Sequence, residues 1–486
     1  MDNPHSATEA LNIITLNCWG LKYLSKLRKE RLEEIGKRLA RASPVPHIVG
    51  LQECWTSEDY LKIRSFTRSI LPYGKFYHSG IFGGGLAILS KWPIEESNML
   101  RYPLNGRPTA FFRGDWFVGK GIACARIRTG PRAKDVVEVF CTHLHAPYEK
   151  EPHDSYICHR TAQAWEIAKL MRGAVERGHL VIGLGDFNMI PLSLAHRLIT
   201  AHAPVMDVWR VLHPDSSLGA SVDTEEKARG RSAPDVIFNL MENGATCDSV
   251  LNTWRWTKDD QKALFKGKHI KIDDHSVDLE ARRLDYIFVG YDSHSNNSWR
   301  IQEAKVGMTD RHSLIGCSLT DHFSVEATIT RAGVHLETSH EGTAGPGAFS
   351  KELGQEIVSE DISQSVGTRS LPPSTYEEIL EMISLYTLRE RRQRRLRLLH
   401  FSISILIFIG CSVAIVWSPH NYVSFILLFT STIGFGAGIL DGLIGGLFVG
   451  SELRALKEFE WEIVNALSTA KGTRSEEERS LRDWFD

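Results

Sequence analysis

Two long apolar stretches in the last quarter of the chain constrain its fold more than any other feature. Residues 398–417 contain no Asp, Glu, Lys or Arg, and a second stretch at 422–440, extendable to 449, follows the short turn Pro419-His420-Asn421. About 20 apolar residues suffice to cross a bilayer, whereas a buried core helix is rarely so long. The sequence therefore predicts two transmembrane helices, at 398–417 and 421–449, that form a hairpin.

Charged residues before the first apolar stretch predict the orientation of this hairpin. A capping-box pattern, Ser374 with Glu377, opens an amphipathic helix at 374–397 that becomes basic toward its end. Basic residues beside a span stay in the cytosol, so we expect the tail at 450–486 to return to the cytosol as well. The N-terminal residues do not resemble a signal peptide, which agrees with a cytosolic catalytic part. The basic side chains predicted to attract anionic phospholipids are Arg389, Arg391, Arg392, Arg394, Arg395 and Arg397.

The second apolar stretch contains an acidic residue and many glycines. We interpret Asp441 as an interfacial residue at a helix end, in preference to a pore or partner contact. The small residues permit close helix packing, either within the hairpin or between two chains of a homodimer. They are Gly434, Gly436, Gly438, Gly442, Gly445 and Gly446.

The first two thirds of the chain read as one α/β domain, predicted at 1–332. The 57 basic and 59 acidic residues are balanced, which argues against a protein dedicated to duplex nucleic acid. Eight scattered cysteines without CxxC pairs argue against a structural zinc site. Residues 333–373 are rich in Gly, Ser and Pro and predict a flexible linker.

Short apolar runs alternate with helical patterns between residues 12 and 330, without strict βαβ repetition. This mixture predicts layered sheets with outer helices. Strands are predicted at 13–17, 47–53, 86–90, 136–142, 179–186, 284–289 and 325–329, and helices at 24–40, 58–69 and 156–177.

Polar side chains follow several of these runs. Asp186 and Asn188 end the buried run that begins at His179, and their spacing of two places both side chains on one side of an extended backbone. Alone, such a pair can be simple turn chemistry. Similar groups end other runs, and we expect them to converge: Asn17, Glu53, His143, Asp285, Asp321 and His322.

The types of these residues suggest metal-assisted hydrolysis. Oxygen ligands favour Mg²⁺, and we predict that Glu53 binds it, helped by Asn17. His322, presented by a turn, could deprotonate a water if Asp285 fixes its tautomer. Each group taken singly could also be an ordinary cap or turn residue.

The order of these motifs resembles the endonuclease/exonuclease/phosphatase superfamily. The matching motifs are Asn17, Gln52-Glu53, His143-Leu144, Gly185-Asp186-Phe187-Asn188, Arg283-Leu284-Asp285-Tyr286 and Thr320-Asp321-His322. The resemblance implies a four-layer α/β sandwich of two mixed β-sheets flanked by helices, and Mg²⁺-dependent cleavage of phosphate esters, with Mn²⁺ as a substitute. It also implies that His143 stabilises the transition state while Asp186 and Asn188 position water and phosphate.

Within this superfamily the chain most resembles neutral sphingomyelinases and the fungal inositol phosphosphingolipid phospholipases C. The C-terminal pair of apolar spans matches that membrane-bound branch. The implied substrate is a phosphosphingolipid in the bilayer, hydrolysed to ceramide and a phosphorylated head group. We expect the membrane to be that of the endoplasmic reticulum or the outer mitochondrial membrane.

The segment 114–121 imitates a Walker A loop. It has Gly121 where a Ser or Thr would bind Mg²⁺, so ATP binding is not expected. The resemblance implies that Asp115 and Lys120 matter for activity, by pairing with each other or by meeting the phosphate. The alternative is a hairpin with an ordinary surface ion pair.

The sequence leaves three alternative functions open. A nuclease would use the same polar groups but predicts a basic groove and no membrane hairpin. An inositol polyphosphate 5-phosphatase normally has an aromatic residue and an Arg after Gly-Asp-x-Asn, whereas this chain has Met189-Ile190-Pro191-Leu192. A catalytically inactive membrane scaffold is the third alternative.

Overall fold

The computed structural model describes most of the chain. The described residues are 9–132, 134–149, 153–268, 270–292, 298–331 and 371–472. The predicted linker at 333–373 lies outside them, apart from residues 371–373, and so does the end of the predicted tail from residue 473.

The chain divides into two compact units. The first contains the segments 1–102, 118–147 and 163–369, and the second contains 103–117, 148–162 and 370–486. Two short segments from within the predicted catalytic domain therefore belong to the same unit as the C-terminal helices.

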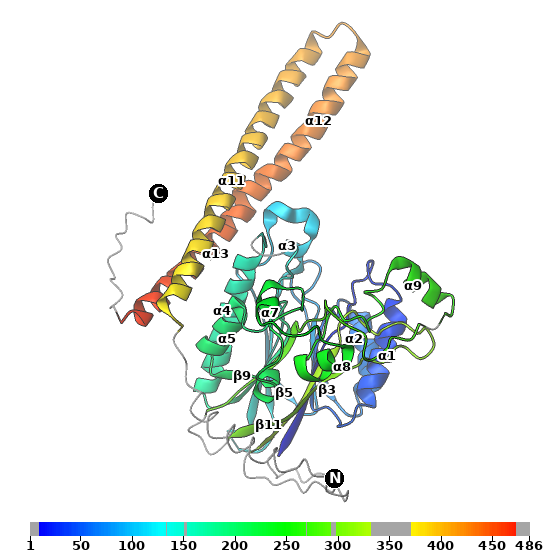
Figure 1. Cartoon of the computed structure of the whole chain (residues 1–486). Coiled ribbons are helices and arrows are strands. Elements are labelled where there is room, and N and C mark those ends of the chain that lie inside the picture. The colour runs from blue at the N-terminus through cyan, green and yellow to red at the C-terminus, as the bar shows by residue number, and fades with distance from the viewer. Residues whose placement is uncertain are drawn as a thin grey trace, which may run out of the picture. The chain divides into compact units, whose positions relative to one another are not determined.

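The first unit contains two six-stranded sheets (Figure 1). Strands β1 and β2 are parallel in one sheet, and β7 and β8 are parallel in the other, whereas the remaining neighbours are antiparallel. Both sheets are therefore mixed. In spatial order the first sheet is β11 (Trp299–Gly307), β12 (Ser324–Arg331), β1 (Ala10–Asn17), β2 (Ile48–Gln52), β4 (Leu86–Ser90) and β3 (Tyr73–Tyr77). The second is β5 (Ile94–Arg101), β6 (Gly121–Arg128), β7 (Val136–His143), β8 (Leu180–Asp186), β10 (Asp285–Gly290) and β9 (Val205–Asp207).

The two sheets pack face to face over a central hydrophobic core. Ile13 and Ile48 of one sheet and Ile182 of the other belong to the same buried cluster. The sheets approach each other closely at Gly50, where an added Cβ would lie 1.8 Å from Leu184 Cδ1. Successive residues of a strand face opposite sides of the sheet, so every second side chain points away from this core and can pack against an outer helix.

Helices cover the outer face of each sheet. Helices α1 (Arg28–Ala40) and α2 (Ser57–Thr67) share one buried cluster with the first sheet. Helices α4 (Ile157–Glu176) and α5 (Leu194–His202) share another with the second sheet. The result is the predicted four-layer α/β sandwich. The predicted elements are present, although α1 begins four residues later than expected.

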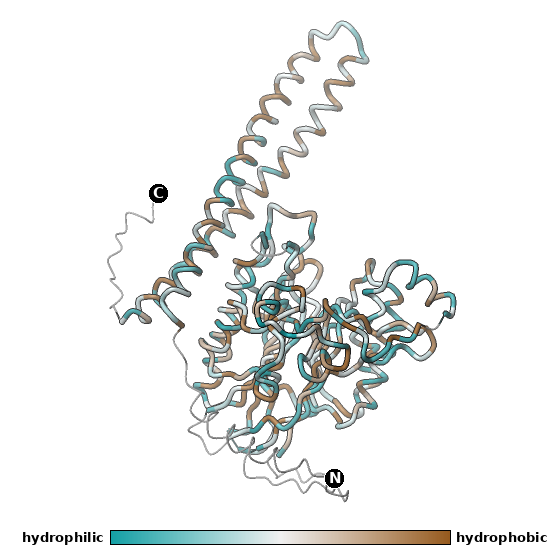
Figure 2. The backbone as a smooth tube through the Cα atoms, viewed as in Figure 1, coloured by the Kyte–Doolittle hydropathy of each residue, from teal (hydrophilic) through white to brown (hydrophobic). Residues whose placement is uncertain are grey.

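The second unit contains the long C-terminal helices. Helix α11 (Pro373–Val416) is followed by α12 (Asn421–Leu443), a π-helical turn η3 (Ile444–Phe448) and α13 (Val449–Ala470). Two helices, Pro373–Val416 and Asn421–Ala470, are long and apolar enough to cross a membrane, and their most apolar windows are only 6% and 11% buried. Figure 2 shows the apolar residues along both. The predicted basic helix and first span are thus one continuous helix, and the predicted tail begins as helix α13.

The structure changes one expectation for the hairpin and agrees with another. Asp441 does not end a helix, because helical backbone continues to Ala470. Its carboxylate instead forms an ion pair with Arg397 and accepts a hydrogen bond from His400 Nδ1 at 2.8 Å, both in α11. Gly438 packs inside the hairpin, since an added Cβ would lie 1.7 Å from Ser404 Oγ, whereas an added Cβ at Gly436 would meet nothing within 4 Å. A homodimer through these helices stays a prediction.

Candidate active site

The strand directions of the first unit bring the predicted polar groups to one edge of the sandwich. Parallel neighbours β1 and β2, and β7 and β8, end at this edge, while β10 and β12 begin there. Asp186 therefore lies directly opposite His143 on one side and Asp285 on the other. The first sheet adds Asn17, Glu53 and His322 at the same edge.

A His–Asp pair forms the centre of the site. His322 Nδ1 lies 2.8 Å from Asp285 Oδ2, and its Nε2 lies 3.9 Å from Asp186 Oδ2. On the other side of Asp186, His143 Nε2 is 3.5 Å from the same oxygen. All four side chains are buried. One carboxylate thus lies between two imidazoles, and a second orients one of them.

Asn17 joins the two sheets at this edge. Its amide nitrogen donates to Asp186 Oδ2 at 2.9 Å and faces Glu53 Oε1 at 3.2 Å, while its oxygen accepts the Trp19 N–H. In this orientation the side-chain nitrogen of Asn17 holds two carboxylates together. Its role as a metal ligand stays a prediction.

Asn188 has a left-handed backbone conformation, with φ 46°. Its N–H donates to Asp186 Oδ1 at 2.9 Å, and its side-chain nitrogen donates to the Leu144 carbonyl at 3.1 Å. Lys120 Nζ donates to that same carbonyl at 3.0 Å. One peptide oxygen therefore fixes both Lys120 and the amide of Asn188.

Asp115 and Lys120 belong to different units. Asp115 begins the short helix α3 (Asp115–Val118), and its carboxylate bonds to the Tyr148 hydroxyl within the second unit. Lys120 is buried in the first unit. The segment consists of a helical turn and the start of strand β6, within the connection between the antiparallel strands β5 and β6.

The electrostatics of the site follow from burial and from neighbouring charges. Burial raises the pKa of Asp186 to about 6, helped by Asp285 and opposed by His322. Burial and then Asp321 raise the pKa of Glu53. Burial, Lys120 and His322 lower the pKa of His143 well below its ordinary value, so this imidazole is neutral. Burial opposes protonation of His322, but Cys247, Asp285 and Asp186 together raise its pKa well above the ordinary value.

The carboxylates can accommodate a cation. Asp186, Asp285 and His322 offer ligand atoms that all lie within 4.8 Å of one another, which makes a buried candidate metal site. Among the described residues, Glu53 Oε2 and Asp285 Oδ1 are buried without a hydrogen-bond partner. Unpartnered carboxylate oxygens beside further acids are suited to a divalent cation.

Arg31 supports this edge and was not predicted. It is fully buried in α1, and its guanidinium donates to the carbonyls of Leu319 at 2.7 Å, Trp19 at 2.8 Å and Cys18 at 3.2 Å. It thereby ties the loop after Asn17 to the loop before His322. Sequence periodicity contains no signal for such a contact, because Arg31 resembles the other basic residues of a charged helix.

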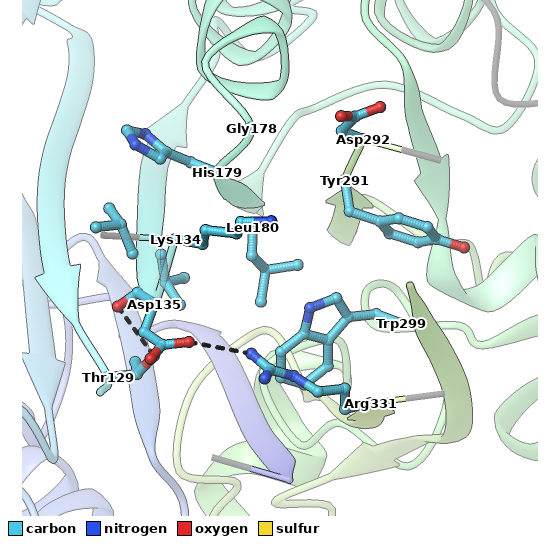
Figure 3. Close-up of a pocket in the computed structure, with 12 residues that line it drawn as sticks. Thr129, Lys134, Asp135, Gly178, His179, Leu180, Tyr291, Asp292, Trp299 and Arg331 are labelled. Carbon is cyan, nitrogen blue, oxygen red and sulfur yellow. Dashed lines mark hydrogen bonds and ion pairs between the residues drawn. The ribbon is translucent and has the colours of Figure 1, made fainter. Parts of the chain in front are cut away.

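A small pocket at the other end of the same strands takes no part in this site (Figure 3). Val136 and Leu180 line it where β7 and β8 begin, and Tyr291 and Arg331 where β10 and β12 finish. Its volume of about 10 Å³ leaves room for about one water.

Comparison with known proteins decides the family. Residues 14–322 match the Endonuclease/Exonuclease/phosphatase family. The chain belongs to this family.

The chain is 38% identical to the inositol phosphosphingolipids phospholipase C of Schizosaccharomyces pombe, over 93% of each chain. It is 34% identical to the protein of the same name from Saccharomyces cerevisiae, over 95% of this chain and 91% of that one. Human sphingomyelin phosphodiesterase 2 is 35% identical over 41% of this chain and 46% of its own length. The predicted branch of the family is confirmed.

Proposed function

We propose that this chain is a membrane-anchored phospholipase C that hydrolyses phosphosphingolipids to ceramide and a phosphorylated head group. The observation that carries the proposal is the buried His322–Asp285 pair beside Asp186, at 2.8 Å, in a chain similar over nearly its whole length to inositol phosphosphingolipids phospholipases C. A hydrogen-bonded His–carboxylate pair suits removal of a proton from an attacking water.

His322 is the proposed general base. Donation of its Nδ1–H to Asp285 fixes the tautomer and leaves Nε2 free to accept the proton of a water. Its raised pKa means that the imidazole is protonated when only the carboxylates surround it. Positive charge among those carboxylates would lower that pKa and release the base.

We further propose that Glu53, with the Asp186 and Asp285 carboxylates nearby, holds the divalent cation. When bound, Mg²⁺, with Mn²⁺ as a substitute, would polarise the phosphodiester and stabilise the leaving oxygen. Asn17 keeps the Glu53 and Asp186 carboxylates together for this purpose.

Neutral donors surround the place of the phosphoryl group. His143 is neutral and can donate a hydrogen bond to a phosphoryl oxygen as charge develops there. Asn188 and Asp186 position the phosphate and the water. Lys120, held at the Leu144 carbonyl, supplies positive charge near His143 and Glu53.

The apolar helices would anchor the enzyme in the bilayer that contains its substrate. A two-chain lipid seldom leaves its bilayer, so a tethered enzyme is held at high effective concentration over its substrate. We propose the endoplasmic reticulum or outer mitochondrial membrane, with both termini cytosolic. Anionic phospholipids are proposed activators that bind the Arg389–Arg395 stretch. Arg397 is the exception in this series, since it pairs with Asp441.

A lipid-panel assay tests the function. Purified full-length protein would be compared with Glu53→Ala and His322→Ala in mixed micelles of inositol phosphosphingolipid, sphingomyelin, phosphatidylcholine or phosphatidylinositol. We expect ceramide only from the sphingolipids, and only with the unaltered protein. Cleavage of the glycerolipids at equal rates would contradict the substrate class, and full activity of His322→Ala would remove the assigned base.

A further inference from the structure

The second unit contains a cavity rich in arginine. Its volume is about 370 Å³, and its polar lining comprises Arg107, Thr109, Arg113, His153, Arg389 and Gln393, with Glu149 and Ser155 at one side. These residues come from segments 103–117 and 148–162 and from helix α11, all within the second unit.

Arg107 is the unusual member of this lining. Its side chain is only 7% exposed, and Arg107 Nε is buried without a hydrogen-bond partner among the described residues. The guanidinium lies over the Tyr156 ring at 5.9 Å. Thr109 Oγ1, in the same lining, is also buried without a partner in the described part of the chain. Buried charges are normally paired, because desolvation of an isolated one is costly.

The neighbouring acids do not neutralise this cavity. Glu149 is already engaged by Arg113 at 2.6 Å and by Ser155. Glu390 lies 3.5 Å from Arg389, but it is fully buried, and burial together with Glu452 raises its pKa to about 8, so that it is largely protonated at neutral pH. Glu452 in turn accepts the Tyr386 hydroxyl at 2.6 Å. Arg107 and Arg389 therefore leave an excess of positive charge in the lining.

We propose that this cavity binds a phosphate group, with Arg107 as its buried ligand, Arg389 at its rim and Thr109 as a hydroxyl donor. A planar guanidinium with fixed donors matches phosphate oxygens, and two of them bind the group more tightly than one. An anion here satisfies both the unpartnered Arg107 nitrogen and the Thr109 hydroxyl.

The position of the cavity along α11 favours a phospholipid head group as the source of this phosphate. Gln393 and Arg389 precede the apolar stretch at 398 by five and nine residues, or about 8 and 14 Å of helix. The head-group layer of one leaflet is about 5–8 Å thick, so the Gln393 side of the cavity lies near it. Phe111 and Phe112, beside Thr109, are 50% and 76% exposed and can contact the interface. The assignment of the phosphate to a phospholipid rests on the proposed membrane function, whereas the phosphate site itself does not.

Binding to full-length protein in neutral detergent micelles tests the inference. The protein would carry His322→Ala, so that no probe is hydrolysed, and the probes are dihexanoyl phosphatidic acid and inorganic phosphate, measured by titration calorimetry. Loss of one charge-assisted contact should weaken phosphatidic acid binding about tenfold in Arg107→Gln and in Arg389→Gln. The matched control is Arg454→Gln, which removes the same charge from an exposed position of α13 in the same unit, outside the lining, and should change the affinity less than twofold.

Each outcome bears on the cavity. Unchanged affinity in Arg389→Gln, or an equal loss in Arg454→Gln, would show diffuse attraction and overturn the inference. Arg389 is about two-fifths exposed, so its variant decides the question even if Arg107→Gln proves unstable. Binding of inorganic phosphate that competes with phosphatidic acid would make free phosphate the ligand, whereas no competition at millimolar phosphate supports the lipid. Because the readout is binding, an absence of hydrolytic activity would disprove the proposed function and leave this inference standing.

Discussion

Two buried clusters of acids and histidine, one in each unit, differ in what they can hold. At the edge of the sandwich, Asp186, Asp285 and His322 gather their ligand atoms within 4.8 Å. In the second unit, Glu452 accepts from Tyr386 and lies 3.2 Å from His159, with buried Glu390 nearby. Only the first cluster meets the geometric criterion for a metal ion among the described residues. Strands that end at one edge bring carboxylates together in the first cluster. In the second cluster the acids lie between packed helices, and the raised pKa of Glu390 favours a bound proton.

The largest expected effect separates the two histidines. His322→Ala should reduce kcat/KM for a phosphosphingolipid by about 10²–10⁴-fold, because it removes the proposed general base. The matched change in the second cluster, His159→Gln, should retain most of the activity. Initial rates of ceramide release would measure both. Comparable losses in the two variants would erase the distinction between the clusters.

Metal dependence gives the next effect. Chelation should abolish hydrolysis, and Mg²⁺ or Mn²⁺ should restore it. Glu53→Gln should raise the Mg²⁺ concentration for half-maximal rate by about 10–100-fold, since an oxygen ligand loses its charge. Glu390→Gln is the control and should leave that concentration unchanged. If Glu390→Gln raised the Mg²⁺ concentration for half-maximal rate and Glu53→Gln did not, the cation would belong to the second unit and the proposed site would be wrong.

The smallest effect concerns pH. Burial and Glu452 raise the pKa of Glu390 from 4.5 to about 8 in the folded protein. The folded state then keeps a proton that the unfolded chain loses, so this group should reduce stability as pH rises from about 4.5 to 8. The charged or titratable groups around it are Glu452, Tyr386, Arg107, Arg389 and Arg397, and His159 lies against Glu452.

Hydrogen exchange in α11 and α13 between pH 5 and 9 would measure this effect. After correction for the intrinsic base catalysis of amide exchange, we expect the protection factors to fall at high pH in the unaltered protein and to change less in Glu390→Gln. An identical pH profile in the two proteins would show that Glu390 does not hold the proton.

All central strands except β6 were predicted from the sequence, whereas the edge strands were not. Strands β1, β2 and β8 are buried on both faces and therefore appear as continuous apolar runs. The edge strands β5 and β11 are largely half-buried or exposed, and β11 has a register shift between Ile301 and Glu303, so neither shows a strong pattern.

Local spacing and length are enough to predict which polar groups end the strands and where two apolar helices lie. The pairing of His322 with Asp285, the contact of the Asn17 amide with two acids and the pairing of Asp441 with Arg397 depend on how distant segments pack. The same packing brings Arg107 and Arg389 to one cavity across 282 positions of the sequence. Periodicity reports which way a side chain faces along its own element, whereas partners depend on which elements pack together.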